Sequence, residues 1–151
     1  MITTYKLFRI INGKLYPLYV LADEEVELGK FLKAKEGEKN EKGKVKARKL
    51  NELSYRAGWH SSNLPKFEHI TSAYKNGKLK KGFAIAECNI FGKNNTKEAQ
   101  AKKGKWYDKC FKSLKEYSGY YEFRTNANAN KDQVWIISDN ITIEKIIEIG
   151  K

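Results

Sequence analysis

The chain has 151 residues, with 30 Lys and Arg against 18 Asp and Glu, which gives a formal net charge of +12. This length is typical of one domain, so we expect residues 1–151 to fold together. Hydrophobic residues make up 40% of the chain, which is too many for a disordered polycation. The sequence has no run of about 18 apolar residues that could form a membrane-spanning helix. It also lacks a signal-peptide pattern at its start, so we expect a cytoplasmic location.

The first predicted element is a β-hairpin. Residues 2–11 are rich in β-branched and aromatic side chains and end at Asn12-Gly13, a strong signal for a two-residue turn. Residues 15–21 are expected to return as the second strand. Residues 26–34 have mixed character and are compatible with a third strand.

The rest of the chain predicts more strand than helix. Residues 83–91 are the most strand-like segment, with small side chains on one face that suit a closely packed helix. Thr96 is a suitable N-cap for a helix near 97–102, and a second helical piece is expected over 105–117. Residues 53–60 are predicted to form a short strand or a turn, and further strands are predicted at 120–125 and 133–138, with a turn at Asn76-Gly77. Residues 141–149 leave strand or helix open. The expected fold class is α+β: a mostly antiparallel sheet of about seven strands with one or two helices.

The positive charge is concentrated in three segments. Residues 30–49 contain nine basic and three acidic side chains, 75–81 contain four lysines and no acid, and 93–115 contain eight lysines and two acids. We expect a mobile basic loop near 35–50 and a polyanionic partner, either nucleic acid or a ribonucleoprotein. Because the excess is almost all lysine, contact should be with phosphates and not sequence-specific. The predicted contact residues are Lys44, Lys46, Arg48, Lys49, Lys102, Lys103, Lys105 and Arg124.

A dense group of functional side chains occurs at Arg56-Ala57-Gly58-Trp59-His60. In an extended segment Arg56 and His60 share a face, where a cation and an imidazole could hold a phosphate and move a proton. The alternative is a surface ion pair, a core tryptophan and a solvated histidine. His69 is the second histidine, and Glu87 is a carboxylate inside an otherwise apolar strand, which indicates either a solvent-facing residue or a site. The candidate catalytic residues are Arg56, His60, His69 and Glu87.

Other chemistry has less support in the sequence. Tyr120 beside charged residues, and Trp59, are candidates for stacking on bases, although ordinary cross-strand packing is the alternative. Two histidines at an H-x8-H spacing match no local ligand pattern, so no metal site is expected. Cys88 and Cys110 lack the pattern of a disulfide framework or of a thiol nucleophile. P-loop, dinucleotide-binding, zincin and serine-esterase motifs are missing from the sequence.

The order of several motifs resembles a domain found in phage and conjugative-element (polyvalent-type) proteins. These motifs are Arg56-x-Gly-Trp-His60, His69-Ile70, Ala86-Glu87, Tyr120-Tyr121-x-Phe-Arg-Thr-Asn126 and Trp135-x-Ile137. Phe83 stands near where that family tends to have a tryptophan. The resemblance implies a mobile-element context, with DNA handling, host takeover or defence evasion as the expected activities. It also marks Asn126 and Trp135 as positions of interest, beside the candidates above.

Two main hypotheses follow for function. The first is a basic nucleic-acid-associated protein of phage or mobile-element origin that needs no cofactor. The second is a nucleotide-directed enzyme, such as an ADP-ribosyltransferase-like protein with NAD as cofactor, which would use Arg56, His60 and Glu87. A third hypothesis is an inhibitor that blocks a ribonucleoprotein surface. Convergence of the catalytic candidates in one pocket would favour the enzyme, whereas lysines along one groove would favour binding.

Overall fold

The computed structural model describes residues 1–151 except 37–40, 42–43, 49, 55 and 125–131. The side chains of residues 44–47, 50–54 and 107 also lie outside the description. Within the described residues, none of the helices has the length and apolar character needed to cross a membrane.

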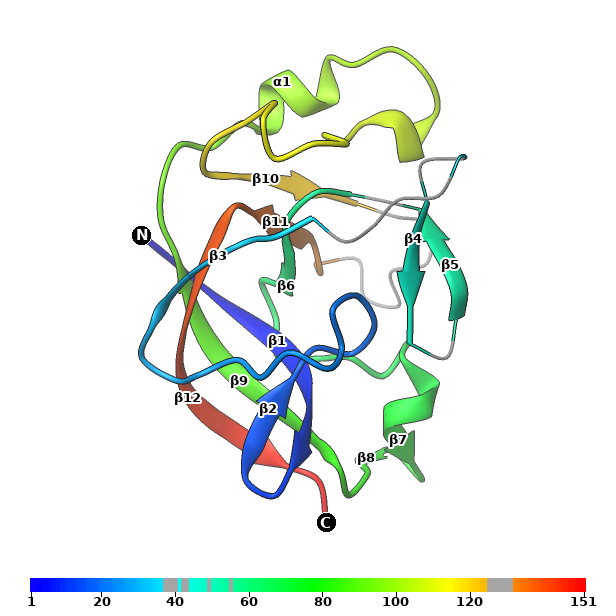
Figure 1. The fold of residues 1–151 in the computed structure, drawn as a ribbon, viewed down its shortest axis with the longest axis vertical. Helices are drawn as coiled ribbons and strands as arrows, with labels where there is room; N and C mark the ends of the chain where they lie inside the picture. The colour runs from blue at the N-terminus through cyan, green and yellow to red at the C-terminus, as the bar shows by residue number, and fades with distance from the viewer. Residues whose placement is uncertain (37–40, 42–43, 49, 55, 125–131) are drawn as a thin grey trace.

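An eight-stranded antiparallel sheet makes up most of the molecule (Figure 1). Its strands follow the order β10-β11-β6-β1-β9-β12-β3, and β2 pairs with β1 beside this path. Their bounds are β1 (Ile2–Ile11), β2 (Lys14–Tyr16), β3 (Phe31–Lys33), β6 (Trp59–Ser62), β9 (Phe83–Ile90), β10 (Tyr120–Phe123), β11 (Trp135–Ser138) and β12 (Asn140–Ile149). Two small antiparallel sheets pair β4 (Lys44–Ala47) with β5 (Leu50–Ser54), and β7 (Tyr74–Lys75) with β8 (Lys78–Leu79).

The main sheet curls so that strands far apart in its order share one core. β11 and β12 are separated along the path by β6, β1 and β9, yet only Asp139 lies between them in the chain. The Asp139 amide donates to the Gly119 carbonyl at 2.9 Å, and the Asp139 carbonyl accepts from the Ala34 amide at 2.8 Å. One buried cluster contains side chains of β1, β9, β11 and β12, including Phe8, Ala84, Ala86, Cys88, Ile136, Ile141 and Ile143. The core therefore lies inside the curl.

This curl explains the small side chains of β9. Ala84, Ala86 and Cys88 are fully buried and face Phe8 and the strands across the interior. The sequence predicted a helix against this face, and that prediction is wrong. Small residues are needed here because the interior of a tightly curled sheet leaves little room between opposite walls.

The opening hairpin is confirmed. β1 and β2 pair from Arg9↔Tyr16 to Ile11↔Lys14, and both turn residues, Asn12 and Gly13, have positive φ angles of 51° and 77°. The second strand ends at Tyr16 and not near residue 21 as expected. From Pro17 the chain leaves the sheet, and residues 17–26, which we call the strap, run across the molecule in front of β1 in Figure 1.

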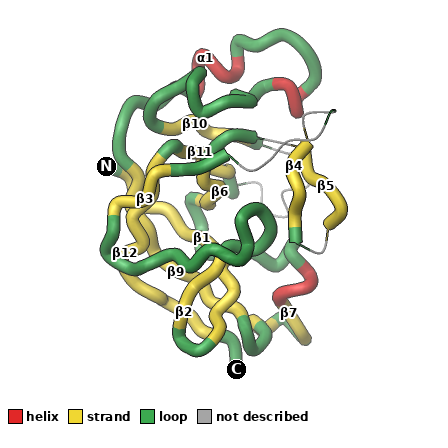
Figure 2. Tube along the Cα trace, viewed as in Figure 1, coloured by secondary structure: helices red, strands yellow, loops and turns green. Residues whose placement is uncertain are grey.

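Helix is scarce, as Figure 2 shows by its short red segments. The described helices are α1 (Thr96–Gln100) and two 3-10 turns, η1 (Thr71–Ala73) and η2 (Trp106–Asp108). The coarse prediction of a mostly antiparallel sheet with few helices is confirmed, but the structure is not clearly of the α+β class. The undecided segment 141–149 forms strand, within β12.

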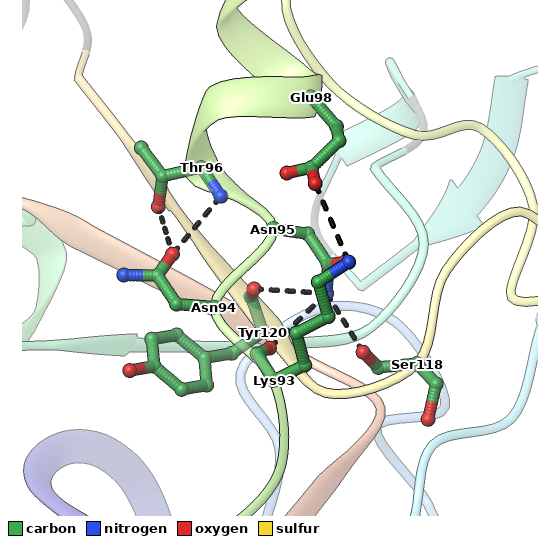
Figure 3. A network of polar contacts seen from close by, with 7 residues as sticks. All are labelled: Lys93, Asn94, Asn95, Thr96, Glu98, Ser118 and Tyr120. Carbon is green, nitrogen blue, oxygen red and sulfur yellow. Dashed lines mark hydrogen bonds and ion pairs between the residues drawn. The ribbon is translucent and has the colours of Figure 1, made fainter.

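The start of α1 is held by a network of polar contacts (Figure 3). Asn94 Oδ1 accepts from the Thr96 amide at 2.9 Å, and Asn95 Nδ2 donates to the carbonyls of Ser118 and Tyr120 at 2.7 and 3.3 Å. The N-cap is therefore Asn95, one residue before the expected Thr96. The network also joins the helix to the chain that enters β10.

The predicted helix over 105–117 is wrong. Only the η2 turn forms there, because aromatic side chains of this segment are drawn into a separate core. Phe111 and Tyr117 stack at 5.1 Å between ring centroids, and each meets Tyr121 edge to face. Burial of three rings outweighs the modest helix propensity of the segment.

Two other predictions differ in detail. Residues 53–60, expected to be a short strand or a turn, are divided between the end of β5, a connection and the start of β6. β4 lies within the segment expected to be a mobile basic loop. Residues 37–40, 42–43 and 49 of that loop lie outside the described residues. The turn at Asn76-Gly77 is confirmed, since it joins β7 to β8.

Candidate functional site: a donor-rich aromatic cavity

A cavity of about 430 Å³ lies between the strap and the main sheet. Its wall combines the basic residues Lys6, Arg56, His60 and His69 with the rings of Trp59 and Trp135. Exposed side chains of Glu24, Lys33 and Lys35 also line it, so the cavity opens to solvent on that side. This volume lies in the range of pockets that hold small organic ligands.

Lys6 extends from β1 into the cavity. It shares a face of the strand with Thr4 and the core residue Phe8. Its Nζ donates to the His60 carbonyl at 2.5 Å and lies 5.7 and 5.9 Å from the ring centroids of Phe8 and Trp59. Within the described part of the chain, Lys6 has no ion pair with a carboxylate. Burial lowers the pKa of this amine to about 8, against a smaller raising effect of Cys88.

His60 follows Trp59 on β6 and is held in one tautomer. Its Nε2 lies 3.1 Å from the carbonyl oxygen of Arg56, which can only accept a hydrogen bond. The ring proton therefore sits on Nε2, and Nδ1 is left as a basic nitrogen. Burial, and then the charge of Lys6, lower the pKa of His60 to about 4, so the imidazole is neutral at pH 7.

Arg56 lies at the entrance to β6 among aromatic rings. Its Cζ is 4.3 Å from the centroid of the Phe123 ring and 5.8 Å from that of Trp106. The buried Nε has no hydrogen-bond partner, and the described residues provide no ion pair for this guanidinium. The indole Nε1 of Trp59 is also buried without a partner. Buried donors without acceptors are uncommon in folded proteins and here lie in the wall of one cavity.

Position 58, between Arg56 and Trp59, requires a glycine. Its φ is 130°, and a Cβ at this position would collide with the hydroxyl of Tyr117 and lie 2.5 Å from the Ser138 carbonyl. Tyr117 donates to the Ala57 carbonyl at 2.6 Å, which holds the chain against this second core. The backbone can therefore turn here and direct Arg56 and Trp59 toward the cavity.

His69 completes the basic part of the wall. Its ring meets Trp135 edge to face at 5.2 Å between centroids. Partial burial lowers its pKa, and the nearby Glu68 opposes this effect. The structure thus brings together three of the four catalytic candidates, namely Arg56, His60 and His69, and adds the stacking candidate Trp59.

Glu87 does not join this group. On β9 it faces away from the inward-pointing Ala86 and Cys88, it stands opposite Tyr5, and its carboxylate lies 3.9 Å from Lys145 Nζ. Tyr120, the other stacking candidate, packs beside the core at the start of β10 and is not part of the cavity wall. A group of three or more His, Cys, Asp or Glu suited to a metal ion is missing from the described residues.

The lysines and arginines predicted to contact nucleic acid are dispersed. Lys102 pairs with Glu116 at 3.7 Å and lies over the Phe111 ring, while Lys103 and Lys105 are exposed in the turn after α1. Arg124 is exposed just after β10. The Arg48 amide donates to the Tyr19 carbonyl of the strap at 3.0 Å. Lys49 and Asn126 lie outside the described residues, as do the side chains of Lys44 and Lys46.

Lys6 is the residue that sequence reasoning missed. It occupies an ordinary position among apolar residues of the first strand, so it resembled a solvent-facing lysine. The available signal was that its neighbours on both sides are apolar or aromatic, which leaves neither face of β1 clearly polar.

Comparisons with known proteins found no matching family model, curated protein or solved structure. The resemblance to phage and conjugative-element proteins is therefore still a prediction.

Proposed function

We propose that this protein binds single-stranded nucleic acid and holds one nucleotide unit in the cavity beneath the strap. The observation that carries the proposal is the pair of cations, Lys6 and Arg56, that line one aromatic cavity without a carboxylate partner among the described residues. A cation taken out of water is costly unless an anion compensates it. An anionic ligand would supply that compensation.

The chemistry of the wall favours a phosphate joined to a flat ring. Arg56 and Trp59 line the cavity and carry buried N–H donors without partners, whose chemistry matches phosphate oxygens or the polar edge of a base. The rings of Trp59 and Trp135 offer apolar faces of the kind on which bases stack. A nucleotide combines both features in one molecule.

The surroundings of Arg56 favour a strand over a free nucleotide. Trp106, whose ring lies 5.8 Å from Arg56 Cζ, is 43% exposed and directly follows the lysines at 102, 103 and 105. An exposed ring beside a basic segment can stack a neighbouring base while the lysines contact its phosphates. Of the dispersed basic residues, those of the turn after α1 are therefore the ones that lie near the Arg56 end of the cavity.

The enzyme hypothesis has less support. An arrangement of Arg56, His60 and Glu87 around one substrate requires the carboxylate in the same cavity, but Glu87 lies on the other face of β9. The mobile-element context stays a prediction from the resemblance.

The proposal is tested by fluorescence anisotropy with a labelled single-stranded oligonucleotide, in DNA and RNA forms. We expect Arg56→Gln to weaken binding by about tenfold or more, since a charge-assisted hydrogen bond contributes about 1.5–3 kcal/mol. Lys78→Gln makes the same change of net charge at the exposed first residue of β8 and should weaken binding less than twofold. Equal effects of the two variants, with circular dichroism showing both folded, would overturn the proposal.

A further inference from the structure

We propose that Lys6 is a reactive amine that forms an imine with an aldehyde carried by a phosphate-bearing ligand in the cavity. This inference deepens the proposed function and rests on it, because the same cavity would hold the phosphate near Arg56 while the carbonyl reaches Lys6. The shared chemistry is an aldehyde attached to a phosphate. Its source is either a sugar that has lost its base within a nucleic acid strand or a free aldehyde phosphate.

The position of Lys6 supports this role over that of a surface lysine. Its Nζ is anchored by one hydrogen bond, to the His60 carbonyl, and otherwise meets the rings of Phe8 and Trp59. A carboxylate that would lock the amine in its charged form is missing from its described neighbours. An amine held this way among apolar groups in an accessible cavity is the arrangement that activates lysine toward carbonyl carbon.

The environment also sets how much free amine is present. At pH 7, a pKa of about 8 leaves a fraction of uncharged amine roughly 300-fold larger than an ordinary lysine has. The charges of Cys88 and His60, the titratable groups nearest in the surrounding strands, stay constant between pH 6 and pH 8. Burial raises the pKa of Cys88 on β9 to about 12, and the pKa of His60 on β6 is about 4. Glu24 and Glu25 of the strap are in ion pairs with Lys35 and Lys14.

The reaction is a condensation that releases one water. The lone pair of Nζ attacks the carbonyl carbon, and the carbon–oxygen π pair moves to oxygen, which takes up a proton while nitrogen loses one. The carbon–oxygen bond of this carbinolamine then breaks, oxygen leaves as water, and the carbon–nitrogen double bond forms. Oxidant and reductant play no part in these steps. Sodium borohydride, added by the experimenter, reduces the imine to a stable secondary amine.

The experiment traps the adduct with two probes. One is a single-stranded oligonucleotide with one base-free deoxyribose, and the other is pyridoxal 5′-phosphate. Each probe is mixed with the full chain at equimolar ratio, and borohydride is added to reduce any imine. Peptide mass spectrometry then identifies the labelled lysines. We expect Lys6 to be labelled at least tenfold faster than exposed lysines such as Lys78, with a rate that rises from pH 6 to about pH 8 and then levels off. The probe that labels Lys6 faster identifies the source of the aldehyde.

Variants separate the possible outcomes. Lys6→Arg keeps the charge but cannot form the imine, so it should lose this adduct, as should Lys6→Met, while Lys78→Arg should keep it. Labelling spread evenly over surface lysines and unchanged in Lys6→Arg would overturn the inference. If Arg56-dependent binding of the intact oligonucleotide is present in that case, the proposed function stands alone. If Lys6 is labelled by pyridoxal phosphate but the intact oligonucleotide does not bind, the nucleic-acid proposal fails and the amine chemistry stands.

Discussion

His60 shows how the cavity controls a single ionisable residue. The side chain cannot gain a proton at neutral pH, because burial and the charges of Lys6 and Arg56 all oppose a second positive charge. The Arg56 carbonyl fixes the remaining proton on Nε2. His60 therefore adds a neutral, oriented imidazole to a wall whose positive charge comes from Lys6 and Arg56.

This arrangement makes stability depend on pH. The pKa of His60 is about 4 in the folded protein and near 6.5 in the unfolded chain, so the unfolded chain binds more protons between these values. The contribution to stability is present above pH 6.5 and is lost as the pH falls toward 4. Between pH 7 and pH 5 we expect the loss to be about 2 kcal/mol.

Urea denaturation of the wild type and of His60→Gln at pH 7 and pH 5 measures this loss. The variant lacks the titrating group and should show a smaller decrease, with the effect of His69 common to both proteins. The titration of the His60 ring by NMR gives its pKa directly. The prediction is wrong if both proteins lose the same stability, or if His60 titrates near pH 6.5.

The strap is the element that turns a sheet surface into a cavity, and Arg9 holds it in place. Arg9 Nε donates to the Pro17 carbonyl at 3.1 Å, one terminal nitrogen donates to the Ala22 carbonyl, and the guanidinium lies 5.7 Å from the centroid of the Tyr16 ring. A single side chain of β1 thus fixes the start and the middle of a segment that has little regular structure of its own, while the Val26 amide at its end donates to the Leu15 carbonyl at 2.9 Å.

We expect Arg9→Met to lower the free energy of unfolding by about 1–3 kcal/mol, because two carbonyls lose a charged donor. The same variant should weaken oligonucleotide binding, since the strap forms one wall of the cavity. Lys78→Met, which also replaces a long cationic side chain but at an exposed position, is the matched control and should change stability by less than about 0.5 kcal/mol. Urea denaturation and anisotropy check both effects. Equal destabilisation by the two variants would contradict this role of Arg9.

For the whole molecule, the net charge of +12 is the main source of non-specific attraction to a polyanion. Binding that depends on phosphate contacts releases counterions, so the logarithm of the binding constant falls linearly with the logarithm of salt concentration. The cavity and the turn after α1 are close to each other through Arg56 and Trp106. We therefore expect the lysines of this turn to contribute more than lysines elsewhere.

The salt dependence tests this expectation. Replacing Lys102, Lys103 and Lys105 together by Gln should reduce the slope for a single-stranded oligonucleotide by about 2, since each lost contact removes about 0.7. Replacing Lys75, Lys78 and Lys80 of the β7–β8 region by Gln makes the same charge change and should leave the slope nearly unaltered. Similar slopes for the two triple variants would show that only net charge matters.

Features that depend on local pattern could be predicted from the amino-acid sequence. The Asn12-Gly13 hairpin, the strand over Phe83–Ile90, the turn at Asn76-Gly77 and the scarcity of helix follow from turn chemistry and from side-chain periodicity over a few residues. The Arg56–His60 segment could also be selected as a candidate site, because arginine, tryptophan and histidine cluster there within five residues, and the structure places all three in the cavity wall.

Which of these residues come into contact depends on the packing of distant segments and could not be predicted. The pairing of β1 with β6 in the sheet brings Lys6 beside His60, although 54 residues separate them. The alternation of side chains along β9 directs Glu87 to the face opposite that of Ala86 and Cys88. The predicted helix over 105–117 is also replaced because of long-range contacts. Burial of three aromatic rings together stabilises the protein more than helix formation in this segment would. Long-range strand pairing decided the first result and long-range burial the second, and local sequence patterns carry no information about which distant segments will meet.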